Sequence, residues 1–342
     1  MKPFFLLPAA VLLAIIPTAC NKSEAAGAGS DSGKPLSFNT YVSETKATQL
    51  TSESITDFGV YAYYTQANAW SNSARPNFMY NQLVSGSRGS GFSYTPVKYW
   101  PALKNAKISF FAYAPYGTAE NGISPRSTNT DSGVPDIVLA SPDGSCNFPD
   151  LVVAEPVYNA GLQETGGSIM FQFHHTLSKI SFQARLAGSD EGYDNTSIYL
   201  NSLLLSAEYP VSGVLDLGSG SWSNVEPGRR LVMSKYIGTG DNGLLLSSTR
   251  QAAGDDYCIL TIPDNRKEYI LSVSYTVITP DEALPGGKLS NSYTVNQSFS
   301  FETEKGKAYD ILISVSPSAI TFGEPEVSAW NVSPEEPGEF IL

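Results

Sequence analysis

The sequence predicts an all-β protein. Among its 342 residues are 29 Gly and 22 Pro, and its aromatic residues include 19 Tyr and 16 Phe. Thr, Val, Ile and Tyr with frequent turn formers are typical of short strands joined by turns. Several segments also alternate apolar and polar residues, which predicts antiparallel sheets with one buried and one solvated face, packed as sandwiches. No long segment shows helical periodicity.

Six segments carry the clearest strand pattern. Each is either a continuous apolar run or an alternation of apolar and polar residues, and Gly, Pro or Asn lies near its ends. These segments are residues 55–64, 107–113, 168–173, 179–186, 268–279 and 308–315. The run 299–315 further predicts a hairpin, because Phe299 and Phe301 share one face, residues 304–307 supply a turn, and the next strand follows at once.

Composition bounds the function classes. The length predicts about two domains, and 42% hydrophobic residues suffice for a core, which excludes wholesale disorder. Acidic residues outnumber basic ones, 33 to 21, for a net charge of −12, and no Lys/Arg cluster offsets them. We therefore expect no nucleic-acid partner. Two His and three Cys leave little material for a metal cluster, so we expect neither a metal nor a cofactor.

The N-terminus predicts export. Lys2 precedes an apolar stretch at 4–16, which is the length of a signal-peptide core and too short to span a bilayer. Cys20 follows, as in a bacterial lipobox, although Pro17 stands where Leu is usual. We predict a lipoprotein signal peptide at 1–19, a Cys20 held by outer-membrane lipid through acylation, and a flexible tether at 20–34. An ordinary secretory signal is the alternative.

The remaining cysteines and the common chemical motifs predict no catalytic centre. Cys146 and Cys258 lie 112 residues apart, and we expect both to be unpaired and mostly buried. The GxGxxG at 238–243 precedes a strand-like run rather than a helix, so it predicts a loop and not a dinucleotide site. His174 and His175 are strand neighbours on opposite faces, which predicts one polar edge residue and one hydrogen-bonded core residue.

Carboxylates and tryptophans leave weaker alternatives open. Acidic pairs occur at Asp255–Asp256, Glu302/Glu304 and Glu335–Glu336; none has a distinctive setting, so solvated turns are the simpler interpretation, and a glycosidase pair is the alternative. The tryptophans Trp70, Trp222 and Trp330 are candidates for stacking on sugars, although burial in a sandwich core is the commoner role of Trp. We predict that the protein is not an enzyme.

Seven short blocks, in order, carry a family resemblance. The chain resembles the fimbrillin-like (Mfa-like) pilin subunits of Bacteroidetes over nearly the whole exported portion. The blocks are FGVYAY at 58–63, MYNQLV at 79–84, YTPVKYWP at 94–101, ISFFAYAP at 108–115, PDLVVA at 149–154, FHHTLSKI at 173–180 and GKAY at 306–309.

The resemblance implies two transthyretin-like antiparallel β-sandwich domains in a subunit of type V fimbriae. With a boundary in residues 161–167, the domains are expected at 47–167 and 168–342. Such pilins are exported as lipoproteins, cut by a trypsin-like protease after a basic residue, and polymerised by strand exchange. The matching cleavage position here is Lys46–Ala47, with Lys where Arg is typical. Tip and anchor subunits of the family can remain uncut.

Residues 35–46 are expected to form a removable N-terminal strand. Leu36, Phe38, Thr40 and Val42 alternate, so they are suited to fill one face of a sandwich. Removing such a strand uncovers an apolar groove and an unpaired sheet edge, which invites a strand from another chain. A permanent first strand is the alternative. The expected replacement comes from the C-terminal region of another subunit, with candidates at 319–322, 327–332 and Phe340–Ile341–Leu342.

The leading interpretation is a structural and adhesive subunit of cell-surface fimbriae. Its expected partners are other fimbrial subunits of the same or a related kind, with a host or bacterial surface receptor as a further possibility. A surface glycan-binding β-sandwich lipoprotein is the alternative, and an unrecognised hydrolase is the third hypothesis. Stalk, tip and anchor roles stay open.

Overall fold

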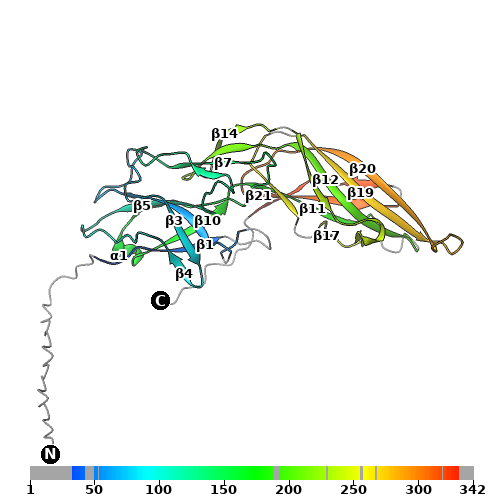
Figure 1. The fold of residues 1–342 in the computed structure, drawn as a ribbon, viewed down its shortest axis with the longest axis horizontal. Helices are drawn as coiled ribbons and strands as arrows, with labels where there is room; N and C mark the ends of the chain where they lie inside the picture. The colour runs from blue at the N-terminus through cyan, green and yellow to red at the C-terminus, as the bar shows by residue number, and fades with distance from the viewer. Residues whose placement is uncertain are drawn as a thin grey trace, which may run out of the picture. The chain divides into compact units, whose positions relative to one another are not determined.

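Strands dominate the computed structural model and form four sheets (Figure 1). Helix is limited, in the described part of the chain, to α1 (Leu162–Thr165) and the 3-10 turn η2 (Gly240–Asn242). The predicted all-β class is therefore confirmed. The structure describes residues 33–42, 50–52, 54–187, 193, 195–228, 230–254, 257–265, 268–317 and 319–330.

The first sheet has eight strands, in the order β1-β10-β8-β5-β2-β3-β4, with β9 also paired to β5. Pairing is antiparallel except between β1 and β10, which run parallel. The strands are β1 (Ser37–Val42), β2 (Asp57–Tyr64), β3 (Met79–Ser87), β4 (Gly91–Ser93), β5 (Ile108–Ala114), β8 (Val152–Ala154), β9 (Val157–Ala160) and β10 (Ser168–His175). One apolar face of this sheet encloses a core of its own, which we call the N-terminal core.

The central strands of this sheet are buried on both faces. On β2, Phe58 and Val60 belong to the N-terminal core, whereas Tyr61 and Tyr63 point the other way and pack with Ile137. That second face lies against a four-stranded sheet of order β14-β13-β7-β6. Its strands are β6 (Ile123–Pro125), β7 (Asp136–Ala140), β13 (Ser212–Asp216) and β14 (Trp222–Glu226).

Two further sheets pack around a second core (Figure 1). One has the order β17-β11-β21-β22, with β18 on β11 and β23 on β21, and the other has the order β15-β12-β19-β20, with β16 on β12. The first consists of β11 (Ser178–Leu186), β17 (Gln251–Ala252), β18 (Cys258–Thr261), β21 (Lys307–Val315), β22 (Ile320–Phe322) and β23 (Glu326–Ala329). The second consists of β12 (Ser197–Glu208), β15 (Arg230–Tyr236), β16 (Leu244–Leu245), β19 (Glu268–Pro280) and β20 (Lys288–Ser300).

The predicted hairpin at 299–315 is wrong. β20 pairs with β19 in one sheet, whereas β21 runs parallel to β11 in the other, so the segment between them crosses from sheet to sheet. Phe301 stabilises this crossing by stacking on Tyr269 with ring centroids 4.3 Å apart. Most strand pairs are antiparallel, as predicted, but β1–β10 and β11–β21 are parallel.

The chain passes from the first sheet to the β17-β11-β21-β22 sheet at Thr176 and Leu177. β10, which we expected as the first strand of the C-terminal domain, lies beside β1 in the first sheet, and β11 begins the next sheet. The four-stranded sheet also combines β7 with β13, from either side of the expected boundary. Together the described residues form one compact unit. The division into two transthyretin-like domains stays a prediction.

Candidate functional site

β1 is an edge strand whose inner face is part of the N-terminal core. Leu36, Phe38, Thr40 and Val42 are at most 2% exposed, whereas Ser37 and Asn39 face solvent. This alternation is what the period-two pattern of the segment predicts for a half-buried strand. The pairing with β10 runs from Ser37 opposite Ser168 to Val42 opposite Phe173.

Phe38 lies at the centre of an aromatic cluster. Its ring stacks on Phe171 of β10 with centroids 5.6 Å apart, and it meets Phe58, Tyr94 and Phe110 at 6.2, 5.4 and 6.1 Å. Such pairs add to the stabilisation that burial alone supplies. Phe38 is therefore the side chain through which the aromatic cluster holds β1.

The start of β1 is held through backbone atoms. The Leu36 N–H donates to the Lys98 carbonyl at 2.9 Å, and the Trp100 N–H donates to the Lys34 carbonyl at 3.0 Å. The Tyr94 hydroxyl donates to the Leu36 carbonyl at 2.9 Å. Burial raises the pKa of Tyr94, although the Lys98 N–H that it accepts opposes the shift. Tyr94 thus stays a proton donor at neutral pH.

The end of β1 is held by a single serine. The Ser52 hydroxyl accepts from the Val42 N–H at 2.8 Å and donates to the Val42 carbonyl at 2.9 Å. Ser52 is fully buried and follows residues 43–49 in the chain. We call β10, Ser52, Tyr94, Lys98 and Trp100 together the β1 seat. At both ends of β1 the β1 seat forms hydrogen bonds with backbone N–H and C=O groups of the strand segment. Every non-proline residue carries both of these groups.

Thr40 is the weak point of this strand. Its side chain is 1% exposed on the inner face of β1, and its hydroxyl has no hydrogen-bond partner among the described residues. A buried hydroxyl without a partner costs stability, because it gives up its hydrogen bonds to water and gains none. The other inward side chains of β1 are apolar.

Replacing Thr40 with Val is therefore expected to raise the free energy of unfolding by about 1 kcal/mol, since it removes the unpaired hydroxyl and keeps the side-chain shape. Urea denaturation measures the change. Thr176→Val is the matched control: Thr176 is equally buried, but its hydroxyl donates to the Leu151 carbonyl at 2.7 Å, so its loss is expected to destabilise. Equal signs for the two variants would contradict the prediction.

Several residues singled out in the sequence lie outside the described residues. They include the expected acylation site Cys20, the expected cleavage position Lys46–Ala47 and the candidate donor residues Phe340, Ile341 and Leu342. The same holds for the acidic pairs 255–256 and 335–336. These expectations stay predictions.

The two adjacent histidines behave as predicted. His174 is partly exposed and lies within hydrogen-bonding distance of Glu155, with Nε2 and Oε1 3.0 Å apart. His175 is buried, and its Nδ1 lies 2.9 Å from Oδ1 of Asp150. The second oxygen of Asp150 accepts from the Leu50 N–H at 2.9 Å, and the His175 ring stacks on Trp330 with centroids 4.1 Å apart. We call Asp150, His175 and Trp330 the junction cluster.

The C-terminal strands lie along one edge of β21. β22 pairs with its end and β23 with its beginning, both antiparallel. Thus two of the candidate donor segments, 319–322 and 327–332, contain residues that pair with their own subunit here. Val327 is 58% exposed, whereas Trp330 is buried and its N–H donates to the Gly306 carbonyl at 2.7 Å. Among the described residues 319–330, Trp330 is therefore the buried side chain.

The cysteines and the Gly-rich motif also match their structural interpretations. Cys146 and Cys258 are not joined by a disulfide, as expected; Cys146 is buried, whereas Cys258 is partly exposed. Burial raises the pKa of Cys146, which keeps it protonated. Residues 238–243 form a turn around η2 and lead into β16, not into a helix. The predicted loop is confirmed.

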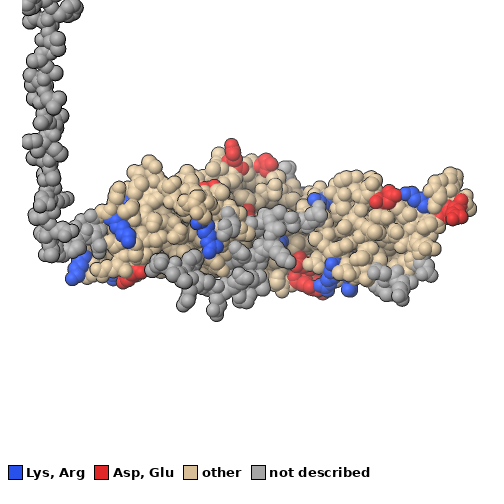
Figure 2. Space-filling model, turned by 90° about the horizontal axis from the view of Figure 1, so that it is seen from below, with Lys and Arg blue, Asp and Glu red and all other residues tan. Residues whose placement is uncertain are grey.

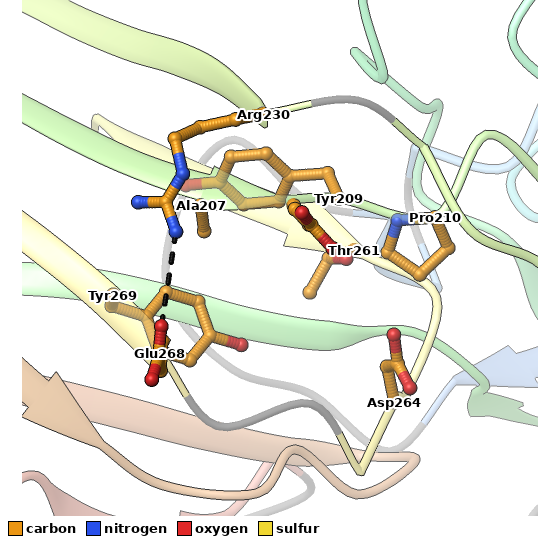
Figure 3. Close-up of a pocket in the computed structure, with 9 residues that line it drawn as sticks. Ala207, Tyr209, Pro210, Arg230, Thr261, Asp264, Glu268 and Tyr269 are labelled. Carbon is orange, nitrogen blue, oxygen red and sulfur yellow. Dashed lines mark ion pairs between the residues drawn. The ribbon is translucent and has the colours of Figure 1, made fainter.

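The pockets gather few reactive groups. One of about 190 Å³ lies between Tyr209 and Tyr269, with Arg230 and Glu268 facing each other across it at 3.9 Å (Figure 3). Another, of about 440 Å³, is lined by His174, Lys305 and Ala329, among others. No group of three or more potential metal ligands occurs within the described ranges. Of the tryptophans proposed for sugar stacking, Trp330 is buried and Trp70 and Trp222 are partly exposed.

Sequence reasoning missed most of the β1 seat and of the junction cluster. Ser52 lies in a Ser/Thr-rich stretch with no distinctive pattern, so no signal was present. Tyr94 and Trp100 did occur in one of the blocks that carry the family resemblance, but their contacts to β1 depend on pairings distant in sequence. No helix within the part of the chain that the structure describes is long and apolar enough to cross a membrane.

A fimbrillin-like family model matches residues 45–330. The chain belongs to the fimbrillin-like family. The resemblance carried by the seven sequence blocks is thus confirmed, and the matched region begins beside the expected cleavage position. The match covers nearly all of the described structure except β1.

Individual relatives agree with the family. The chain is 26% identical over 227 residues to the fimbrium subunit Fim1C of Phocaeicola vulgatus, an alignment spanning 61% of this chain and 59% of that one. A fimbrial protein from Bacteroides vulgatus superposes with a TM-score of 0.68 at 21% identity, over 86% of this chain and 99% of the other. A candidate cell adhesion protein from Bacteroides ovatus gives 0.53 at 17%, over 88% and 99%. These structures share the fold of this fimbrillin-like chain.

Proposed function

We propose that this protein is a structural subunit of cell-surface fimbriae that polymerises by strand exchange. In this proposal a protease cuts after Lys46, β1 leaves the β1 seat, and a strand of another subunit takes its place. The observation that carries the proposal is β1 itself. Together with the preceding Leu36 it supplies four inward residues to the N-terminal core, yet within the described part of the chain its outer edge is hydrogen-bonded only near its two ends.

Energetics favour replacement over an empty seat. Each fully buried aliphatic or aromatic side chain is worth roughly 1.5–3 kcal/mol, so loss of Leu36, Phe38 and Val42 exposes an apolar surface worth several kcal/mol. It also leaves one edge of β10 without hydrogen-bond partners. An incoming strand with apolar residues at alternate positions restores both.

The donor is proposed to come from the C-terminal region. The β1 seat receives inward side chains at four alternate positions, 36, 38, 40 and 42, which span seven residues. Phe340–Ile341–Leu342 can supply two of these at most, because alternate residues of a strand face opposite sides. The donor therefore includes residues before Phe340. The Pro-containing, acidic spacer 333–339 is proposed to let this end reach a neighbour.

Anchoring and location follow from the same proposal. Acylation of Cys20 would hold the exported precursor at the outer membrane, and cleavage after Lys46 would release the mature subunit from that lipid. The fimbrillin-like family and its fimbrial relatives support a location at the cell surface. Other fimbrial subunits are the proposed partners.

Treatment of the exported chain with a trypsin-like protease is expected to give a ladder of oligomers on a denaturing gel, with Ala47 as the new N-terminus. Lys46→Gln is expected to abolish the ladder, because β1 then stays attached. Lys34→Gln is the matched control, since cleavage after Lys34 would leave residues 36–42 in place. Deleting residues from 333 onward is expected to block the ladder while the monomer still folds.

Two outcomes would overturn parts of this scheme. An undiminished ladder from Lys46→Gln would remove cleavage at that position from the mechanism. Oligomers of normal length from the truncated chain would exclude the extreme C-terminus as donor and leave the segments of β22 and β23 as candidates.

A further inference from the structure

β20 is an unusually exposed edge strand. It is the last strand of its sheet in the described part of the chain, and Figure 1 shows it (orange) along the outer side of β19. It pairs with β19 from Glu268 opposite Ser300 to Pro280 opposite Lys288, with no bulge in the register. Along β20 only Val295 and Phe299 are partly shielded from solvent, and the other residues are exposed.

This edge lacks the features that usually prevent pairing with another chain. Natural edge strands carry charges, prolines or bulges. From Leu289 to Phe301 the chain has neither a charged residue nor a proline. β15, at the opposite edge of the same sheet, carries Arg230 and Lys235. Of the two edge strands of this sheet, β15 therefore carries charges that hinder pairing with another chain, whereas β20 carries none from Leu289 onward.

The side of β20 that faces the sandwich interior extends beyond the covered core. Leu289 and Tyr293 are on this side and are 46% and 42% exposed. Tyr293 stacks on the buried Tyr275 of β19, with ring centroids 5.3 Å apart. The apolar face of the sheet thus continues past β19 at these two positions of β20, although Asn291 lies between them on the same side.

The opposite side of β20 carries a ladder of hydroxyl and amide groups. Ser274 pairs with Thr294 at 2.9 Å and Thr276 with Ser292 at 3.0 Å across the two strands, and the Ser272 hydroxyl donates to Asn296. These contacts join β20 to β19 along a register that has no bulge. A second strand would find both a rigid backbone edge and polar side chains able to continue the ladder.

The side chains of β20 are arranged almost symmetrically about Thr294. Positions equally distant from it carry matched chemistry: Tyr293 and Val295 are apolar, and Ser290 and Ser298 are hydroxyls. Further pairs are Ser292 with Asn296, Asn291 with Gln297 and Leu289 with Phe299. In an antiparallel pair of two β20 strands centred on Thr294, apolar residues therefore meet apolar ones and polar residues meet polar ones.

We propose that two copies of this chain associate through β20, edge to edge and antiparallel, with Thr294 on the two-fold axis. The two β15-β12-β19-β20 sheets then form one continuous sheet. The partner is a second copy because the strand is complementary to itself, as an isologous contact requires. Like charges do not meet in this arrangement: Lys288 faces Ser300 of the second copy, and Lys288 is already paired with Asp241.

The face seen in Figure 2 carries scattered charged side chains on a largely uncharged surface, whereas the chain as a whole has a net charge of −12. Long-range repulsion between copies is screened over about 8 Å at physiological ionic strength. The β20 contact concentrates backbone hydrogen bonds and apolar area in an uncharged segment. The contact is independent of β1, so it links intact precursors as well as subunits already joined by strand exchange.

Sedimentation of the Lys46→Gln chain, in which the proposed strand exchange cannot begin, tests the contact. The parent is expected to show a reversible monomer–dimer equilibrium. Thr294→Lys places two like charges on the axis and is expected to raise the dimer dissociation constant at least about tenfold. Ser234→Lys on the exposed edge strand β15 is the matched control and is expected to change nothing. Mixing Thr294→Lys with Thr294→Glu is expected to restore dimers, which separates charge repulsion from misfolding.

Cross-linking tests the register. In the proposed pair the two residues 294 face each other at a Cα distance of about 4.5–5.5 Å, within disulfide range. Thr294→Cys is expected to give an oxidised dimer, whereas Ser290→Cys places its thiols about 27 Å apart along the strand and is expected to give none beyond the parent level. A parent that is monomeric throughout, a dimer unaffected by Thr294→Lys, or equal cross-linking of both cysteine variants would overturn the proposal.

Discussion

Replacing Phe38 with alanine is expected to lower the free energy of unfolding by about 3–5 kcal/mol. Phe38 is 2% exposed and contacts the rings of Phe58, Tyr94, Phe110 and Phe171. Four rings on three different strands and one loop cannot all move inward to fill the space, so a cavity remains and its cost adds to the lost burial. Urea denaturation with an unchanged slope measures the effect.

Asn39→Ala is the matched control for this prediction. Asn39 is the next residue of β1, faces solvent, and donates one exposed hydrogen bond to Ser168 at 3.3 Å. Its replacement is expected to change stability by no more than about 0.5 kcal/mol. If the two variants were equally stable, the N-terminal core would not depend on β1, and the energetic basis of the strand-exchange proposal would be lost.

The Phe38 result also bears on the order of events in assembly. In the proposed scheme, a precursor stabilised by several kcal/mol through β1 does not exchange strands until the connection at 43–49 is cut, because dissociation of an attached strand is reversed at once by its high local concentration. Thr40 works in the opposite direction, since its unpaired hydroxyl weakens the resident strand. A donor with an apolar residue at that position would bind the same seat more tightly.

Local sequence pattern predicted the strands because side-chain alternation is a local property. The inward set Leu36, Phe38, Thr40 and Val42 followed from the period of two, and the burial pattern of β1 repeats it. The continuous run at 55–64 was recognised as a strand, and its continuity reflects a central position with cores on both sides. These features depend on neighbours two residues apart.

Strand partners could not be predicted in the same way. The parallel pairing of β1 with β10 joins residues about 130 positions apart, and the parallel pairing of β11 with β21 is equally distant. Nothing in a strand's own alternation specifies which edge it joins, so Phe299–Val315 was interpreted as a hairpin although its strands belong to different sheets. The Ser52 hydroxyl bonds the N–H and C=O of Val42, as a neighbouring strand would. This contact could not be predicted from the sequence pattern either.

The histidine pair shows the same limit of sequence-based prediction within one site. Opposite faces of β10 were predictable for His174 and His175, but their partners were not. Asp150 reaches His175 from 25 residues away, and Trp330 from the far end of the described chain. The junction cluster therefore emerges only from the fold.

Asp150→Ala is expected to destabilise the protein by roughly 3 kcal/mol, because it removes a carboxylate that contacts both the buried His175 ring and the partly buried Leu50 N–H. Oδ1 of Asp150 lies 2.9 Å from Nδ1 of His175, and Oδ2 accepts from the Leu50 N–H at 2.9 Å. The side chains of Asp150 and His175 are 7% and 1% exposed, so water cannot replace the lost bonds without opening the junction. Because His175 stacks on Trp330, a change in tryptophan fluorescence is expected to accompany the loss.

Glu155→Ala is the control for the Asp150→Ala prediction, because the two carboxylates contact neighbouring histidines and differ in burial. Glu155 pairs with the neighbouring His174 at a similar distance, 3.0 Å, but their side chains are 64% and 33% exposed. A solvent-exposed pair of this kind contributes about 0–1 kcal/mol, since both groups remain hydrated when it breaks. Asp150→Asn retains one acceptor and is expected to fall between the two alanine variants. Equal losses for Asp150→Ala and Glu155→Ala would show that the junction cluster does not couple Leu50, β10 and Trp330.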